Sequence, residues 1–201
     1  MNNMKTIEVI AVAYDNPEQV ACFVYMMKSQ TASNWKLRII HDGGGEKYDN
    51  VLSVVNNIKD DRVFISSTDK WNGNAGHVSR DYALKNPIFD SYYTIITNTD
   101  NYYVPTWISE INKREEDFVY WDCVHNHVNP NFDRQVPYGL LNAKVKYMCI
   151  DMGCAAIKTE IARKIGFNSR RYMPADWDYF EECLPSCQNK YKIPQILFIH
   201  N

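Results

Sequence analysis

Apolar and amphipathic segments alternate along the chain. Residues 7–13 (IEVIAVA) form a β-rich apolar run typical of a buried parallel strand, and residues 17–31 have helical spacing behind Asn16 as N-cap and Pro17 as first helical residue. The same criteria predict strands at 37–41, 62–66, 92–97, 118–124 and 196–199, and helices at 47–58, 77–85, 105–114, 159–165 and 176–184. This order predicts an α/β fold with three layers, α/β/α, around a central, mostly parallel sheet.

The composition is that of one ordinary globular domain spanning residues 1–201. Apolar residues make up 45% of the chain and charged residues 23%. The net charge of −2 argues against a broad surface for nucleic acid or anionic lipid, and no apolar run is long enough to span a bilayer. The six cysteines are irregularly spaced and no secretory leader is recognisable, which predicts reduced thiols and a cytoplasmic location.

Three polar clusters directly follow predicted strands. They are Tyr14-Asp15, Asp42-Gly43 and residues 98–101 (NTDN). In an open α/β sheet, ligands bind beyond the carboxyl ends of the strands. The sequence therefore predicts a binding site along this edge.

The cluster at 98–101 has the chemistry of a divalent-metal site. Oxygen ligands from Asn98 and Asp100 suit Mg²⁺ or Mn²⁺, and such an ion bridges the phosphates of a nucleotide diphosphate. A polar turn in which the aspartate caps the next helix explains the cluster equally well. Asp42, with three glycines behind it, can accept the N3–H of uracil, although a flexible turn is the simpler interpretation.

A second acidic group lies at 176–182 (DWDYFEE). A carboxylate there can act as the base for an acceptor hydroxyl, while acids in the first turn of a helix are also favoured by the helix dipole. His125 and His127 lie on the same side of a strand, but no third ligand follows at a known zinc spacing. Residues 125–145 form a long polar connection of the kind that often closes over an active site.

Together these segments resemble the GT-A glycosyltransferases, particularly family two, over nearly the whole chain. Residues 9–17 (VIAVAYDNP) are similar to that family's first strand and uridine-contacting turn, which implies nucleotide contacts for Ala13, Tyr14 and Asp15, with Tyr14 stacked on the base. Residues 39–43 (IIHDG) are similar to its second strand and Asp-Gly motif, which implies that Asp42 recognises the base.

Two further segments are similar to the motifs of this family that lie near the diphosphate. Residues 72–84 are similar to the family's Asn-x-Gly and Arg-Asn-x-Ala-Leu segment, which implies that Asn72, Gly73 and Arg80 lie near the phosphates. Residues 97–105 (TNTDNYYVP) are similar to its DxD segment, and this is the most specific match. It implies a metal ligand at Asp100 and a ribose contact at Thr99, with Asn98 in place of the first acid.

The end of the chain is similar to the family's acceptor side. Ala175-Asp176 falls on the Glu-Asp motif, with Ala175 in place of the glutamate, which implies that Asp176 is the catalytic base and Asp178 the next candidate. A retaining mechanism, which needs no such base, stays open. His200 resembles the late histidine that joins the metal shell in many of these enzymes.

The resemblance implies transfer of a hexose or 6-deoxyhexose, glucose- or rhamnose-like, from a UDP-sugar to an oligosaccharide or glycoprotein acceptor. The chain also resembles the first domain of multidomain glycosyltransferases encoded by large algal viruses (chloroviruses), which implies further domains in the same polypeptide. The first alternative is a non-catalytic nucleotide-sugar- or glycan-binding module, which Asn98 and Ala175 favour. The second is a sugar nucleotidyltransferase, but residues 14–17 (YDNP) lack the Gly-rich, Arg-containing loop of that class.

Overall fold

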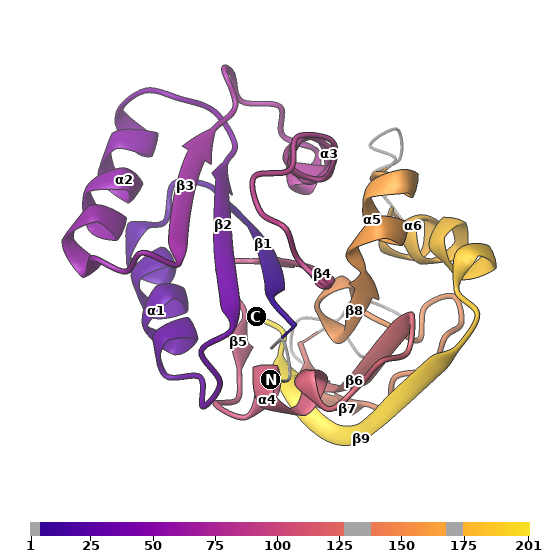
Figure 1. The fold of residues 1–201 in the computed structure, drawn as a ribbon. Coiled ribbons are helices and arrows are strands. Elements are labelled where there is room, and N and C mark those ends of the chain that lie inside the picture. The colour runs from indigo at the N-terminus through magenta and orange to yellow at the C-terminus, as the bar shows by residue number, and fades with distance from the viewer. Residues whose placement is uncertain (1–4, 127–137, 168–174) are drawn as a thin grey trace.

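The computed structural model describes residues 5–126, 138–167 and 175–201. Its strands form one nine-stranded sheet in the order β3-β2-β1-β4-β8-β6-β9-β5, with β7 paired to β6 (Figure 1). The strands are β1 (Ile7–Ala13), β2 (Trp35–His41), β3 (Val63–Ser67), β4 (Tyr93–Asn98), β5 (Tyr102–Tyr103), β6 (Phe118–His125), β7 (Gly139–Leu141), β8 (Ala155–Lys158) and β9 (Lys190–Ile199). The long ladders are parallel, which confirms the predicted α/β fold with a mostly parallel sheet.

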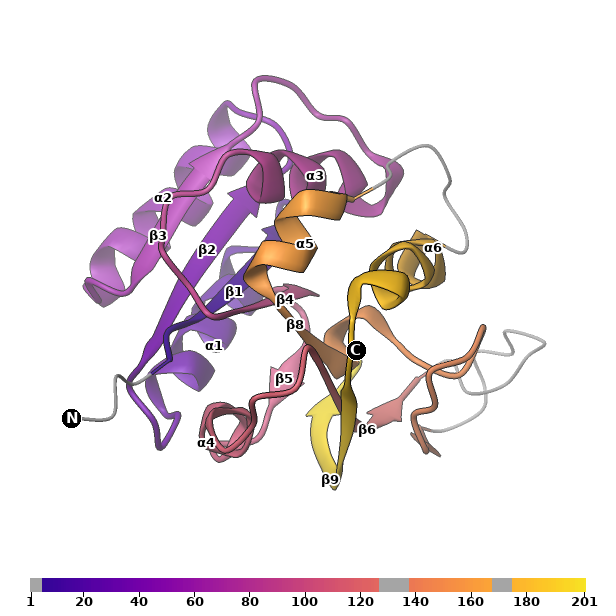
Figure 2. The ribbon, with the colours of Figure 1, turned by 45° about the vertical axis from the view of Figure 1, so that its right-hand side comes forward.

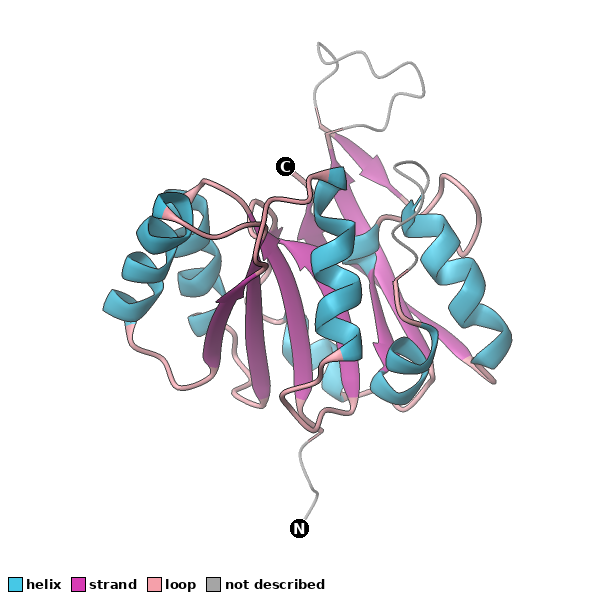
Figure 3. Ribbon diagram, turned by 90° about the horizontal axis from the view of Figure 1, so that it is seen from above, coloured by secondary structure: helices cyan, strands magenta, loops and turns pink. Residues whose placement is uncertain are grey.

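Helices cover both faces of this sheet. The helices are α1 (Pro17–Lys28), α2 (Glu46–Ile58), α3 (His77–Lys85), α4 (Trp107–Asn112), α5 (Thr159–Ile165) and α6 (Ala175–Cys183). The pair α1 and α2 packs on one face, while α3, α5 and α6 pack together on the other (Figures 2 and 3). The three-layer arrangement is thus present, and the turns that follow β1, β2 and β4 open at the same edge of the sheet. No helix in the described ranges is both long and apolar enough to cross a bilayer.

The amino-terminal half of the sheet follows directly from local patterns. Every residue of β1 is buried, because β2 and β4 flank it in parallel and helices cover both its faces. Asn16 caps α1 by accepting a hydrogen bond from the Gln19 amide, and Pro17 is the first helical residue, as predicted. The apolar stripe of α1, which includes Val20, Phe23 and Met27, repeats at helical spacing and faces the core.

The carboxyl-terminal half departs from the pattern. β9 begins at Lys190 rather than 196, because Pro194 interrupts the strand pattern in the sequence but lies where the register with β6 shifts at a bulge. The predicted helix at 105–114 is only the short α4. The sequence also does not predict β5 or β7, which have two and three residues.

An aromatic stack joins the two halves below the edge where the polar clusters gather. Tyr103 stacks between Trp107 and Phe198, with ring centroids 3.7 and 4.8 Å away. The Tyr103 hydroxyl lies 2.8 Å from Thr97 Oγ1 and 3.1 Å from the Gly153 carbonyl. A Cβ at Gly153 would lie 2.5 Å from that hydroxyl, so only glycine fits here. The stack therefore holds Thr97 and Gly153 in place.

Candidate functional site

Two adjoining cavities open at the carboxyl ends of β1, β2 and β4. They share Ala75 and Asn98 as lining residues and have volumes of about 420 and 310 Å³. The larger, the β1 cavity, is lined by Val12, Ala13, Tyr14, Gln19, Asp42, Trp71, Gly73, Asn74, Ala75, Gly76, Asn98, Thr99 and Asp100. The smaller, the α6 cavity, is lined by Ala75, His77, Arg80, Thr97, Asn98, Asn101, His125, Leu141, Met148, Ile150, Asp151, Met152, Gly153, Ala175, Asp176, Trp177 and His200. Polar clusters from distant parts of the chain thus share one edge.

Two aromatic rings form the outer wall of the β1 cavity. Tyr14 stacks on Trp71 with ring centroids 6.0 Å apart, and both rings are exposed. The Lys47 ammonium lies 2.6 Å from the Asp15 carboxylate and 4.7 Å from the centre of the Tyr14 ring. Exposed, oriented rings of this kind suit stacking against a planar ligand.

The Asp42 carboxylate organises the loop that closes this cavity. It is buried, and it accepts hydrogen bonds from the Asn72 and Gly73 backbone amides at 3.1 and 2.9 Å. The side-chain amide of Asn72 donates a further bond at 3.1 Å. Gly73 has φ of +63°, a conformation that side-chain-bearing residues rarely adopt. Asp42 therefore has a structural task besides any contact with a ligand.

Asp100 lies at the inner end of the β1 cavity with an unpaired oxygen. Its Oδ1 is buried and has no hydrogen-bond partner among the described residues. Burial raises the pKa of Asp100, and the Asp151 charge adds to this, while Arg80 opposes it. Thr99 is buried next to it and bonds the Val12 carbonyl through its amide and hydroxyl. An orphaned carboxylate oxygen facing a polar cavity fits a cation.

Arg80 bridges the two cavities. Its guanidinium donates to the Asn98 side-chain oxygen at 2.5 Å and to the Ala75 carbonyl at 2.8 Å, and lies 2.6 Å from His77 Nδ1. Burial lowers its pKa, although the charges of Asp176 and other acids oppose this. Because Arg80 remains cationic, it presents a fixed positive charge between the cavities.

Two carboxylates of like charge share the α6 cavity. Burial and the charge of Asp151 raise the pKa of Asp176 to about 6. For Asp151 itself, burial raises the pKa, but a hydrogen bond from His125 and the charge of His200 outweigh burial and lower the pKa. One acid is thus held ionised while the other titrates near neutrality, which is typical of groups that move protons.

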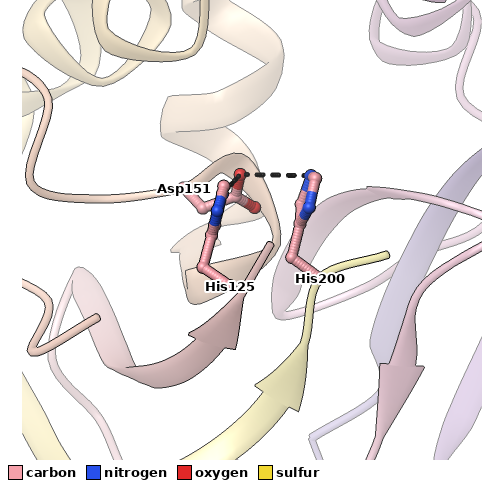
Figure 4. Close-up of side chains that lie close together, drawn as sticks. All are labelled: His125, Asp151 and His200. Atoms are coloured by element: carbon pink, nitrogen blue, oxygen red, sulfur yellow. Dashed lines mark hydrogen bonds and ion pairs between the residues drawn. The ribbon is translucent and has the colours of Figure 1, made fainter. Parts of the chain in front are cut away.

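The carboxylate of Asp151 also meets two histidines. Its Oδ2 lies 3.4 Å from His125 Nε2 and 3.7 Å from His200 Nε2 (Figure 4). The two imidazoles stack with centroids 4.2 Å apart and planes 11° apart. These three ligand atoms lie within 4.8 Å of one another, which makes the cluster a candidate metal site.

The structure brings most of the predicted site residues to these cavities. Ala13, Tyr14, Asp42, Gly73, Asn98, Thr99 and Asp100 line the β1 cavity, and Arg80, Asn98, Asp176 and His200 line the α6 cavity. Three others do not line either one. Asp15 pairs with Lys47, Asn72 supports Asp42, and Asp178 lies two residues beyond Asp176 on α6.

Several residues of the cavities are absent from the sequence-based prediction. The sequence does not predict Trp71 or Asp151 there, and it offers His125 only together with His127, which lies outside the described residues. Most of residues 125–145, the predicted lid, also lies outside the described residues. The sequence feature that could point to Asp151 as a site residue is its place as an acid inside the otherwise apolar segment 149–157.

Solved glycosyltransferase structures resemble this chain in fold, whereas no protein-family model and no curated protein sequence matches it. The chain is similar to S. aureus TarS 1-349 with a TM-score of 0.75 and 11% identity, and to the longer S. aureus TarS structure with 0.76 and 13%. It is also similar to the mannosyltransferase PcManGT from Pyrobaculum calidifontis, solved with GDP-Man and Mn²⁺, with a TM-score of 0.71 and 12% identity. TarS 1-349 has also been solved with UDP and with UDP-GlcNAc.

These matches cover 98% of this chain in each case. The chain spans 60% of TarS 1-349, 36% of the longer TarS chain and 57% of PcManGT. At identities this low, the likeness concerns the backbone. The chain has the GT-A fold of nucleotide-sugar glycosyltransferases.

Proposed function

We propose that this protein is a metal-assisted glycosyltransferase that moves a hexose or 6-deoxyhexose from a UDP-sugar to an acceptor hydroxyl. One observation carries the proposal. The β1 cavity, with an aromatic wall and an orphaned Asp100 oxygen, adjoins a second cavity that holds Asp176. A donor nucleotide and an acceptor need two such compartments that meet at the reacting carbon.

The β1 cavity is the proposed nucleotide site. Uracil would stack on Tyr14, with Ala13 and Asp15 beside it, and would donate its N3–H to Asp42. Each carboxylate oxygen has about two acceptor positions. Oδ1 of Asp42 already accepts from Asn72 and Thr68, whereas Oδ2 accepts from the Gly73 amide alone among the described residues and has capacity for this contact. UDP complexes of the similar TarS support a uridine donor.

Asp100 is the proposed ligand for Mn²⁺ or Mg²⁺. Its buried orphaned oxygen fits an ion that prefers oxygen ligands. When bound, the ion neutralises charge on the leaving diphosphate. Asn98 and His200 are the additional ligands expected from the sequence, although the Asn98 oxygen already accepts from Arg80, and an ion would compete for it.

Arg80 and Asp176 act on either side of the transferred sugar in this proposal. The fixed guanidinium of Arg80 would stabilise negative charge on the diphosphate, with Asn72, Gly73 and Thr99 shaping the donor site. Asp176 would take the proton of the acceptor hydroxyl, because a carboxylate with a pKa of about 6 is both ionised and basic at neutral pH. Asp178 is the second candidate for this role.

A nucleotide-sugar panel tests the proposal. We expect UDP-sugars to raise the Tm in the presence of Mn²⁺, by more than GDP-, dTDP- or CMP-sugars do, and expect EDTA to abolish the effect. Release of UDP from the stabilising donor would then be measured with and without oligosaccharide or glycoprotein acceptors. If no nucleotide-sugar changes the Tm, the proposal is wrong.

A non-catalytic nucleotide-sugar- or glycan-binding module is the second candidate. It is favoured by Asn98, whose oxygen is engaged by Arg80, and by Ala175 in the position of an expected acid. This candidate predicts donor binding without UDP release under any condition. We further propose that residues 1–201 act as one catalytic domain of a longer, cytoplasmic viral polypeptide, as the resemblance to algal-virus enzymes implies.

A further inference from the structure

We infer that His125, Asp151 and His200 form a binding site for one transition-metal ion, separate from the cation assigned to Asp100, so that His200 is a ligand of this ion and not of the Asp100 cation. The inference concerns the chain's own ligand atoms and does not rest on the proposed transfer reaction.

The topology places the two histidines side by side. β6 and β9 run parallel, and Val124 is the partner of Ile199 in their register. The residue after each of these strand positions is a histidine, and the His200 amide bonds the Val124 carbonyl at 2.9 Å. Equivalent positions on parallel neighbours point to the same side, which explains why the imidazoles stack. Figure 4 shows both rings beside the Asp151 carboxylate.

The distances suit an ion held by all three side chains. Ligand atoms at about 2.0–2.2 Å from one tetrahedral ion lie roughly 3.4 Å from each other. The Asp151 Oδ2 lies 3.4 Å from His125 Nε2 and 3.7 Å from His200 Nε2. These distances suit one ion, which the three side chains would hold once the two stacked rings, whose planes are 11° apart, turn so that both Nε2 lone pairs converge on it.

Neighbouring groups fix the orientation of the ligands. Asp151 Oδ1 accepts from the Gly153 amide at 2.8 Å, which leaves Oδ2 facing the histidines. His200 Nδ1 lies 2.7 Å from Asn126 Oδ1, so Nε2 faces Asp151. Outer contacts of this kind orient the ligands in known metal sites.

The ligand set indicates the class of metal. Two imidazoles and one carboxylate favour Zn²⁺, Co²⁺ or another first-row ion, whereas the carboxylate of Asp100 and the amide oxygen of Asn98 favour Mg²⁺ or Mn²⁺. All three residues line the α6 cavity, so a fourth ligand would come from there. A water, a hydroxyl or a phosphate oxygen suits that position.

Cobalt binding by tag-free, EDTA-stripped protein without nucleotide tests the site. We expect one Co²⁺ per chain with a visible absorption band, displaced by Zn²⁺. His125→Gln and Asp151→Asn should each weaken binding at least roughly 100-fold, since even outer-shell changes cost about 10–100-fold. His77→Gln is the matched control, because His77 lines the same cavity but pairs with Arg80.

Thermal melts of the stripped proteins would show whether each variant folds, and His200→Gln replaces any that does not. Asp100→Asn should retain Co²⁺ binding even where it abolishes Mn²⁺-dependent nucleotide binding, so the two proposals can fail separately. The inference is overturned if the wild-type protein binds no Co²⁺, or if binding survives in the folded variants of His125 and Asp151. A stacked histidine pair bonded to a carboxylate, without metal, would then be the correct description.

Discussion

Two carboxylates, Asp42 in the β1 cavity and Asp176 in the α6 cavity, have opposite surroundings. In the β1 cavity, Asp42 accepts hydrogen bonds from the Asn72 and Gly73 amides and holds a loop in place. In the α6 cavity, Asp176 accepts one long bond from the described residues, 3.4 Å from the Met152 amide, and faces the like charge of Asp151. A buried carboxylate whose oxygens accept hydrogen bonds stabilises the fold. A buried carboxylate with few hydrogen bonds lowers the stability but remains available for proton transfer. The difference separates an acid that holds the loop of the β1 cavity from an acid suited to proton transfer in the α6 cavity.

The largest effect is expected from removing the proposed base. Asp176→Asn should lower the rate of sugar transfer by about 10²–10⁴-fold, because no carboxylate remains to take the acceptor proton. Mn²⁺-dependent binding of the UDP-sugar should change little, since the β1 cavity is intact. Transfer rates and donor Kd values would be measured on the same preparations.

Asp178→Asn is the matched control, since it changes the next acid on α6, which does not line the cavity. If Asp178→Asn lowers the transfer rate more than Asp176→Asn does, Asp178 is the base and Asp176 is not. Unchanged transfer in both would favour a mechanism that needs no base.

The next effect concerns the cation on the donor side. Asp100→Asn should weaken UDP binding by about 10–100-fold in Mn²⁺ and leave metal-free binding nearly unchanged, because it removes an ionised ligand at constant size. Calorimetry with and without EDTA checks this. Asp90→Asn, an exposed acid away from both cavities, is the control. Equal losses with and without metal would contradict the assignment.

A smaller effect is expected at the aromatic wall. Tyr14→Ala should weaken UDP binding by roughly 5–150-fold, the range expected for removing one base–aromatic stack worth about 1–3 kcal/mol. The loss should not depend on Mn²⁺, in contrast to that of Asp100→Asn. Tyr25→Ala changes an exposed tyrosine on α1 and serves as the control. A Mn²⁺-dependent loss would mean that Tyr14 acts on the phosphates instead.

The β1 cavity is largely predictable from the sequence because it is local. Tyr14, Asp42 and Asp100 each lie within a few residues of a strand end, and the strands before them were placed within two residues of β1, β2 and β4. Once the order of parallel strands is known, their carboxyl ends must meet. The turn, the cap and the strands there follow from short-range preferences.

The α6 cavity cannot be predicted in this way because it depends on register. His125 and His200 are far apart in sequence and meet only because β6 pairs with β9 across a bulge at Pro194. Asp151 enters from a 3₁₀ turn at Met152–Cys154, which it caps through the Gly153 amide. No spacing rule links the three residues, so the cluster becomes visible only after folding.

A fourth prediction tests the structural task of Asp42. Asp42→Asn should lower the free energy of unfolding by about 1–3 kcal/mol, because an amide nitrogen would replace an oxygen that accepts from the chain. For a chain of this size that corresponds to a fall in Tm of about 2–12 °C. Calorimetry without ligand measures it, with Asp90→Asn as the control. An unchanged Tm would mean that the loop does not depend on Asp42.

The smallest expected effect is an increase in Tm, whereas Asp42→Asn should lower the Tm. The pKa of Asp176 is raised to about 6 from 3.8, so the folded protein binds the proton more tightly than the unfolded chain does. Stability from this group is therefore fully present below about pH 3.8 and is lost as pH rises to about 6. Asp176→Asn mimics the neutral acid, and its Tm in EDTA at pH 7.5 should exceed that of the wild type by a few degrees.

The pH dependence distinguishes this cause from a change in packing. The gain in Tm for Asp176→Asn should shrink as the pH falls from 7.5 to 4, because the wild-type carboxyl becomes neutral as well. A gain that is constant with pH would point to hydrogen bonding or packing, and a loss at pH 7.5 would show that the bond from Met152 outweighs burial of the charge. If Asp42→Asn lowers the Tm and Asp176→Asn raises it, the Asp42 carboxylate stabilises the fold, whereas the Asp176 carboxylate is retained although it destabilises the fold.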